Sequence, residues 1–136
     1  VESYSLDSGE STQGLLALLQ EINVRLTALE SGSVATTAVV VTVVGGEFLI
    51  DGVAKDTINM NLGGKVRFDV SDASNAGHPL RIYDTASKDN IASGATSVSG
   101  TAGEAGATVT YAPDATGTVF YQCQNHSNMG GQIVVS

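Results

Sequence analysis

From residue 38 to the end of the chain, short runs of alternating apolar and polar residues are separated by glycine-rich turns. This two-residue period, rich in β-branched residues, is typical of strands with one buried face. Gly45-Gly46 and Asp51-Gly52 have the composition of tight hairpin turns. The predicted strands are 38–44, 47–50, 57–61, 65–70, 79–83, 107–111, 119–122 and 132–135. Seven or eight short strands at this spacing predict an antiparallel β-sandwich.

The first thirty residues have a helical pattern instead. Apolar residues alternate there at spacings of four and three, at Leu15, Leu19, Ile22, Leu26 and Leu29. This spacing is typical of a coiled-coil seam, and leucine at position a with isoleucine at d favours three or four helices over two. We therefore expect an oligomerisation helix over about residues 12–30, in a domain of residues 1–33 that precedes a β domain of residues 34–136. The alternative is a single amphipathic helix that packs on its own β domain.

Composition excludes several classes of function. The 136 residues carry a formal net charge of −8, which disfavours a nucleic-acid partner because phosphate backbones repel an acidic chain. The acidic residues are scattered, as on a solvated surface. A single cysteine excludes an internal disulfide. No apolar run approaches the roughly 20 residues needed to span a bilayer, so we expect no membrane span.

The residues with metal-binding side chains are concentrated in the C-terminal half. Both histidines, the one cysteine and one of the two methionines fall at predicted strand ends: His78, Cys123, His126 and Met129. Three of them follow the pattern Cys-x2-His-x2-Met on one short loop, and His78 begins the 79–83 strand. A thiolate, two imidazoles and a weak thioether are the ligand set of a type 1 copper site. The pattern therefore predicts metal-binding capacity, with copper as the expected ion.

Three other interpretations of these residues remain open. A free cysteine is often simply a small buried apolar residue. Cys123 and a histidine could instead form a nucleophilic pair, for which Asn125 is the only nearby orienting group. Zinc could occupy the thiolate and the two imidazoles, although methionine is a poor zinc ligand.

About three-quarters of the chain, residues 38–136, resembles the cupredoxin family of β-sandwiches. The segments that carry the resemblance are 48–52, 77–80 and 121–131. It implies a Greek-key sandwich in which His78 and His126 are the imidazole ligands of copper, Cys123 the thiolate and Met129 the axial thioether. The copper need not be present in the isolated protein. In one respect the chain departs from the family: Pro79 follows the upstream histidine and has no N–H to donate to the thiolate.

The same segments look most like cupredoxin-like domains in structural proteins of marine tailed phages, cyanophages among them. That resemblance implies a non-enzymatic fibre or surface-decoration component of the virion, a trimer in contact with other virion proteins. The alternative is a blue-copper electron carrier, anchored or oligomerised through its N-terminal helix and located in the periplasm or at the cell surface.

Overall fold

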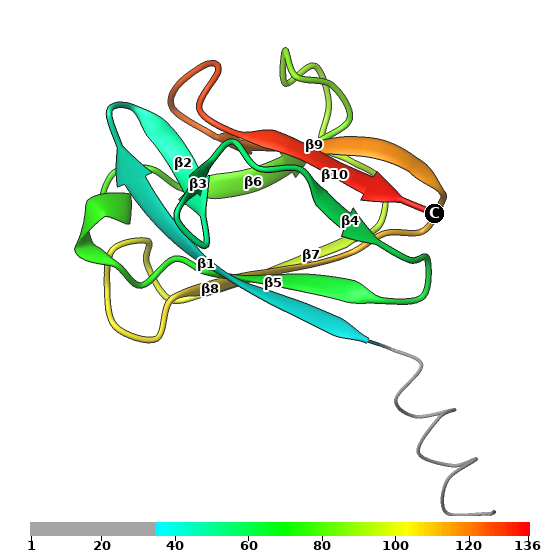
Figure 1. Cartoon of the computed structure of the whole chain (residues 1–136), viewed down its shortest axis with the longest axis horizontal. Helices are drawn as coiled ribbons and strands as arrows, with labels where there is room; N and C mark the ends of the chain where they lie inside the picture. Colours follow the sequence, from blue (N-terminus) through cyan, green and yellow to red (C-terminus); the bar gives the residue numbers. More distant parts are fainter. Residues whose placement is uncertain (1–34) are drawn as a thin grey trace, which may run out of the picture. The chain divides into compact units, whose positions relative to one another are not determined.

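The computed structural model describes residues 35–136 of the chain. These residues contain ten strands and one short 3-10 helix, joined by loops and turns (Figure 1). The strands are β1 (Thr36–Val44), β2 (Glu47–Ile50), β3 (Val53–Ala54), β4 (Ile58–Met60), β5 (Lys65–Asp69), β6 (Leu80–Tyr83), β7 (Ala95–Ser99), β8 (Thr108–Ala112), β9 (Gly117–Cys123) and β10 (Gly131–Val135). The helix η1 (Ala73–Asn75) lies between β5 and β6. The predicted N-terminal helix, its five seam residues and the boundary at residue 33 lie outside the described residues.

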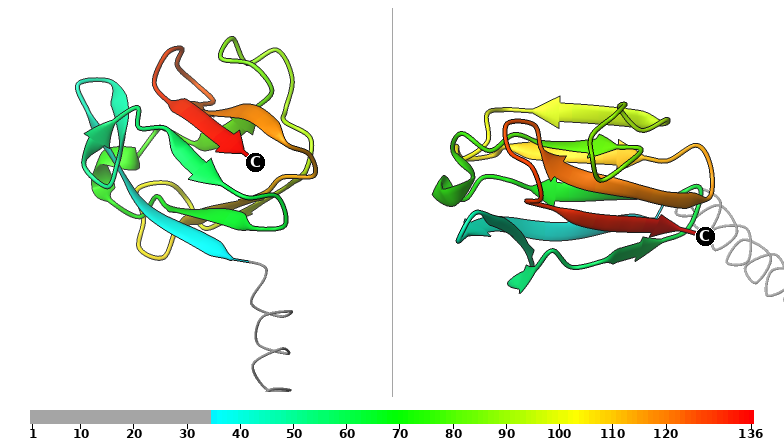
Figure 2. Two further views of the ribbon diagram at one scale, coloured as in Figure 1. Left: turned by 45° about the vertical axis from the view of Figure 1, so that its right-hand side comes forward. Right: turned by 90° about the horizontal axis from the view of Figure 1, so that it is seen from above.

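The strands form two sheets that pack face to face, so the predicted all-β sandwich is confirmed (Figures 1 and 2). One sheet has the order β3-β2-β1-β5-β8-β7 and the other the order β4-β10-β9-β6. The chain passes from one sheet to the other repeatedly, which places strands distant in sequence side by side. The loops that follow η1 and β9 consequently meet at one end of the sandwich.

All eight predicted strands are present, with bounds that differ from the predicted ones by two residues at most. The predicted total of seven or eight strands is wrong, because the described residues also contain β3 and β7. All residues of these two strands are exposed, so their sequences lack the apolar and polar alternation on which the prediction depended.

The expectation of purely antiparallel pairing is also wrong for two pairs of strands. β1 runs parallel to β5, and β10 runs parallel to β4. In each pair, the chain between the two strands contributes at least one strand to the other sheet before it returns. Such a crossover connection allows two strands of one sheet to lie side by side in parallel. The remaining pairs in the described residues are antiparallel.

The core lies between the sheets and is filled by the inward-facing residues of both. Its largest fully buried side chains include Phe48, Phe68, Tyr111 and Tyr121. The rings of Phe68 and Tyr121 lie 5.7 Å apart, so they join the two sheets directly. Burial of a large apolar side chain contributes roughly 1.5–3 kcal/mol, and the core provides a rigid base for the loops at its ends.

The hydroxyl of Tyr121 is held inside this core by one hydrogen bond. It donates to the carbonyl oxygen of Asp56 at 2.6 Å. Burial, and to a smaller extent the negative charge of Asp56, raises the pKa of Tyr121 far above its ordinary value of 10.0. The phenol is therefore neutral in the folded protein throughout the physiological range.

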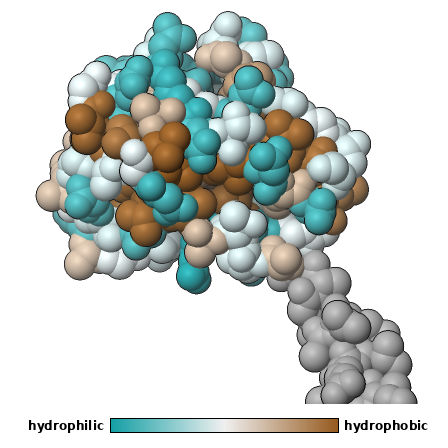
Figure 3. Space-filling view, viewed as in Figure 1, coloured by the Kyte–Doolittle hydropathy of each residue, from teal (hydrophilic) through white to brown (hydrophobic). Residues whose placement is uncertain are grey.

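Apolar residues are also present on the surface, where they form a band across the face seen in Figure 1 (Figure 3). The large apolar side chains with the greatest exposure in the described part of the chain are Val40, Val44, Val53, Leu62, Ile91 and Val98. Within residues 35–136, no helix has the length and hydrophobicity required to span a membrane.

Candidate metal centre

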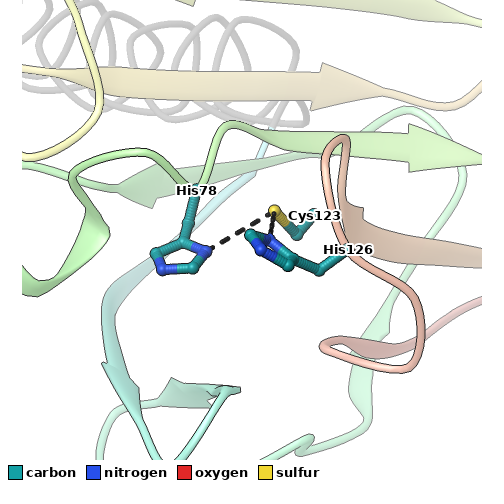
Figure 4. A group of neighbouring side chains, drawn as sticks. All are labelled: His78, Cys123 and His126. Carbon is teal, nitrogen blue, oxygen red and sulfur yellow. Dashed lines mark hydrogen bonds between the residues drawn. The ribbon is translucent and has the colours of Figure 1, made fainter.

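Three of the four predicted ligands converge at the end of the sandwich where the loops after η1 and β9 meet (Figure 4). The Sγ atom of Cys123 lies 3.7 Å from Nδ1 of His78 and 3.4 Å from Nδ1 of His126. The ligand atoms of the three side chains all lie within 4.8 Å of one another. The predicted association of His78 with the Cys123 loop, across forty-five positions of sequence, is thus confirmed.

The two S–N distances fit a shared metal ion. With imidazole nitrogen at about 2.0 Å and thiolate sulfur at about 2.3 Å from one ion, and with about 110–120° between the bonds, the two atoms lie about 3.5–3.7 Å apart. The two observed S–N separations lie within about 0.1 Å of this range. One soft thiolate and two imidazoles in a trigonal arrangement form the donor set of type 1 copper. His78, Cys123 and His126 therefore have the chemistry of such a site and its two S–N spacings. The two imidazole nitrogens, which complete a cluster up to 4.8 Å across, would have to move closer to share one ion, because bonds of about 2.0 Å place them at most about 4 Å apart.

Exposure to solvent differs sharply among the three ligands. Cys123 is 0% exposed, His78 is partly buried and His126 is exposed. The two imidazole rings lie 4.8 Å apart, tilted by 43°. The sulfur is thus screened from water, while the imidazole of His126 connects the cluster with the surface.

The position of His78 is fixed by the turn that connects η1 to β6. Asn75, the last residue of η1, is fully buried, and its Nδ2 donates to the carbonyl of Val41 on β1 at 2.8 Å. The backbone N–H of His78 donates to the carbonyl of Asn75, also at 2.8 Å. Gly77 has a φ of +78°, a conformation that glycine adopts at little cost. Through Asn75, this turn therefore ties His78, which precedes β6 of one sheet, to β1 of the other sheet.

The other two ligands belong to what we call the ligand loop, residues 123–129, between β9 and β10. Its base is closed by Gln122, whose buried Oε1 accepts from the N–H of Gly130 at 3.0 Å. The N–H of Gln124 donates to the carbonyl of Pro79 at 2.8 Å. The side chain of Asn125 donates to the carbonyl of Gly77 at 3.2 Å. Two hydrogen bonds thus join the ligand loop to the residues on either side of His78.

Glycine is required at the end of the ligand loop because other groups lie too close. A Cβ atom at Gly130 would lie 1.6 Å from the carbonyl oxygen of Tyr121, and one at Gly131 would lie 2.6 Å from that of Lys55. Neither residue is among those with positive φ. Close packing against the backbone of β9 at Gly130, and against the backbone of Lys55 at Gly131, is the reason for these glycines.

Met129, the fourth predicted ligand, ends the ligand loop and is 2% exposed. Its carbonyl oxygen accepts a 2.7 Å hydrogen bond from the N–H of Phe48 on β2, which ties the loop to the other sheet. This residue is buried at the same end of the sandwich, and the role of its thioether as axial ligand stays a prediction.

Lys88 is a residue of this site that the sequence analysis missed. It lies in the segment 84–106, which has no recognisable periodicity, and its ammonium group donates to three carbonyls of the ligand loop. Lys88 is the one basic residue of that segment. This isolated positive charge was the one feature of the segment that could have pointed to Lys88. Nothing in the sequence indicates that its partners are carbonyls of the ligand loop.

One aromatic hydroxyl near the cluster, that of Tyr83, responds to its buried surroundings. Burial raises the pKa of Tyr83, on the edge strand β6, above its ordinary value; Arg81 opposes this shift and Cys123 adds to it.

The chain was compared with family models, curated proteins and solved structures. No family model matches the chain, and no curated protein matches it. Among solved structures, rusticyanin from Thiobacillus ferrooxidans is 22% identical over 74% of this chain and 77% of its own, with a TM-score of 0.49. Pseudoazurin from Methylobacterium extorquens AM1 is 22% identical over 74% of this chain and 75% of its own, also with a TM-score of 0.49.

One rusticyanin structure is described as that of a copper protein. No protein found in these comparisons links the chain to phages, so the resemblance to virion structural proteins is without support among them. Similarity this low assigns neither a family nor a function, and the functional argument depends on the geometry of the cluster itself.

Proposed function

We propose that residues 35–136 form a type 1 copper domain whose function is electron transfer. The observation that carries this proposal is the position of Cys123 Sγ, 3.7 Å and 3.4 Å from the Nδ1 atoms of two histidines. Copper held there would accept and release one electron, with thiolate and imidazole ligands that bind it well in both oxidation states. His78, Cys123 and His126 would hold the ion, with Met129 as a weak fourth ligand.

The surroundings of the cluster suit this function in two ways. The ligand loop is hydrogen-bonded to the turn before β6 and to β2, which holds its backbone in place in the absence of the ion. A site whose geometry changes little between oxidation states transfers electrons with little reorganisation. The exposed imidazole of His126 is the shortest connection between the buried sulfur and a partner protein at the surface.

The same geometry argues against the Cys-His nucleophile that the sequence left open, and we propose a non-enzymatic function. A nucleophilic sulfur has to reach its substrate, and Cys123 is 0% exposed. Asn125, the expected orienting group, donates its amide to the carbonyl of Gly77 instead. Two imidazoles face one sulfur, which is a ligand arrangement rather than a nucleophile–base–orienter series.

A second candidate function is a metal-stabilised structural domain of a larger particle, such as the virion expected from the sequence. The observation in its favour is Pro79, which cannot donate an N–H to the thiolate. Within residues 35–136 the hydrogen-bond partners of Cys123 Sγ are the two imidazoles alone. In this function the ion would stabilise the fold by binding the folded state alone. For an electron carrier we propose a periplasmic or cell-surface location, and for a structural domain a location in the virion.

A copper titration tests the proposal. Cu(II) is added to metal-free protein under argon, and the visible spectrum is recorded together with that of Cys123→Ala as control. We expect an intense thiolate-to-copper charge-transfer band at one equivalent in the wild type and no such band in the variant. Absence of the band in the wild type would refute the type 1 site.

Electrochemistry then separates the two functions. An electron carrier gives a reversible one-electron couple and rapid electron exchange between copies of the protein. A purely structural site gives thermal stabilisation by copper without rapid exchange, and that result would favour the second candidate.

A further inference from the structure

The ammonium group of Lys88 lies against the backbone of the ligand loop. It donates to the carbonyl of Cys123 at 3.0 Å, of His126 at 2.9 Å and of Gln124 at 3.4 Å. An ammonium group has three N–H donors, so all of them point to this one loop. Two of the three carbonyls belong to predicted metal ligands.

The segment that presents Lys88 is itself held in shape. The N–H of Asp84 donates to the carbonyl of Asn90 at 2.9 Å, and the N–H of Asn90 donates back to the carboxylate of Asp84 at 3.0 Å. Thr85 and Asp89 are joined by two further hydrogen bonds. These contacts make residues 84–90 a compact turn that projects the lysine from the end of β6.

The backbone of Lys88 has an uncommon conformation. Its φ is +61°, in the left-handed region that few non-glycine residues adopt. The N–H of Lys88 donates to the carbonyl of Thr85 at 3.1 Å, which fixes this conformation within the turn. Such backbone strain persists where the surrounding structure determines it and is concentrated at functional sites.

Lys55 provides an internal comparison because it has almost the same backbone angle, with a φ of +52°. Its ammonium group forms one exposed ion pair with Glu47, at 3.7 Å. Exposed pairs of this kind contribute little to stability. Both lysines are partly buried, but Lys88 forms no ion pair with a carboxylate in the described part of the chain. Its positive charge is therefore directed at the loop carbonyls alone.

We infer that Lys88 is a positioning residue that holds the ligand loop in its metal-binding conformation before the metal arrives; this rests on the proposed copper site. The carbonyls of residues 123, 124 and 126 follow one another around the bend that separates the thiol from the exposed imidazole. The ammonium group draws the three oxygens toward one point, which fixes the angle between Cys123 and His126. Groups that orient metal ligands in this way commonly affect metal affinity about 10–100-fold.

A fixed positive charge at this point has a second consequence. It disfavours additional positive charge on a neighbouring ion, so it stabilises Cu(I) relative to Cu(II). Lys88 thus raises the reduction potential of the site, a property that a purely mechanical support would not affect.

The test compares Lys88→Met with Lys55→Met, because both variants replace a lysine of positive φ with an uncharged side chain of similar length. The first readout is the hydrogen exchange of the Gln124 amide in the metal-free protein, measured by NMR, with the His78 amide as internal reference. Lys88→Met is expected to accelerate exchange at Gln124 by about tenfold or more, because the loop opens locally. Lys55→Met is expected to leave it unchanged.

The second readout is copper itself, measured by competition with a chelator and by spectroelectrochemistry. Lys88→Met is expected to weaken copper binding by about 10–100-fold, to shift the visible band and to lower the midpoint potential. Lys88→Arg, which keeps the charge and N–H donors, is expected to restore most of the potential. Equal exchange, affinity and potential in Lys88→Met and Lys55→Met would overturn the inference.

The two readouts also separate this inference from the proposed function. If the wild type shows no copper band, the proposed function fails, while exchange at Gln124 still decides whether Lys88 positions the loop. If Lys88→Met does not fold, Lys88→Gln, which keeps one amide donor without the charge, is measured by the same criteria.

Discussion

Leu80 and Cys123 lie directly opposite each other across the ladder between β6 and β9. This register determines the site, because His78 lies two residues before Leu80 and His126 three residues after Cys123. A shift of one residue in the ladder would turn Cys123 to the other face of its sheet. The burial of Leu80 and Cys123, both 0% exposed, opposes such a shift.

Copper is expected to raise the thermal stability of the metal-free protein. A ligand that binds the folded state alone contributes about 2.7 kcal/mol at a free concentration 100 times its Kd. For a domain of about 100 residues this corresponds to a rise in Tm of about 10–20 °C. Differential scanning calorimetry with and without the ion measures it, and His78→Ala should show little of the rise. An equal rise in that variant would mean that the ion binds elsewhere.

Replacement of Met129 tests the predicted axial ligand. Met129→Leu is expected to retain copper and the intense visible band, because the thiolate and both imidazoles remain. Its reduction potential is expected to rise, since a weak donor to Cu(II) is removed. Met60→Leu is the matched control, a second buried methionine, 7% exposed, on β4. If both variants keep the wild-type potential, Met129 is not a ligand.

Gly130→Ala is expected to destabilise the fold strongly. Its Cβ would overlap the carbonyl oxygen of Tyr121, and only backbone displacement between β9 and β10 could relieve the overlap. We expect a loss of about 3 kcal/mol in the free energy of unfolding, at the upper end for overpacking. Gly46→Ala, where φ is +78° and no atom lies within 4 Å, should cost about 1 kcal/mol. Urea denaturation compares the two, and equal losses would contradict the steric argument.

Tyr121 is expected to make the fold sensitive to alkali. Burial raises the pKa of Tyr121 in the folded state, so its stabilising effect is complete below pH 10 and is lost as the pH rises toward the folded-state pKa. Above pH 10 the unfolded state ionises first, and stability falls by about 1.4 kcal/mol per pH unit from this group.

Tyr121→Phe removes that dependence together with the hydrogen bond to Asp56. At neutral pH the variant should be less stable by about 1–2 kcal/mol. The difference from wild type should stay constant from pH 6 to 9 and shrink above pH 10, as measured by urea denaturation. A constant difference up to pH 12 would contradict the effect of burial on Tyr121.

The strands could be predicted because nearly all of them have one buried face. β5, for example, alternates strictly between Val66 and Phe68 inside and its other residues outside. β7 could not be predicted in this way because all five of its residues are exposed, so backbone pairing with β8 rather than a buried face defines it. The parallel pairs β1–β5 and β4–β10 are likewise set by crossovers between the sheets, which leave no local pattern.

The metal cluster could be predicted because few other residues could compete for the role. The chain has one cysteine and two histidines, and all three belong to the cluster. The groups that support them could not be predicted in the same way. Lys88 contacts the ligand loop from 35 to 38 positions away, and Asn75 bonds to Val41 across 34 positions. Hydrogen bonds to backbone carbonyls can be made by many residue types, so such pairs have no sequence signature.

The difference in exposure between Cys123 and His126 also governs how fast the protein can take up the metal ion. An ion that arrives from solvent meets the exposed imidazole of His126 before it reaches the buried sulfur of Cys123. Metal uptake should therefore follow two-step kinetics, a rapid capture that depends on ion concentration and a slower rearrangement that does not. Bulky thiol reagents should label Cys123, which is 0% exposed, only as fast as this end of the sandwich opens.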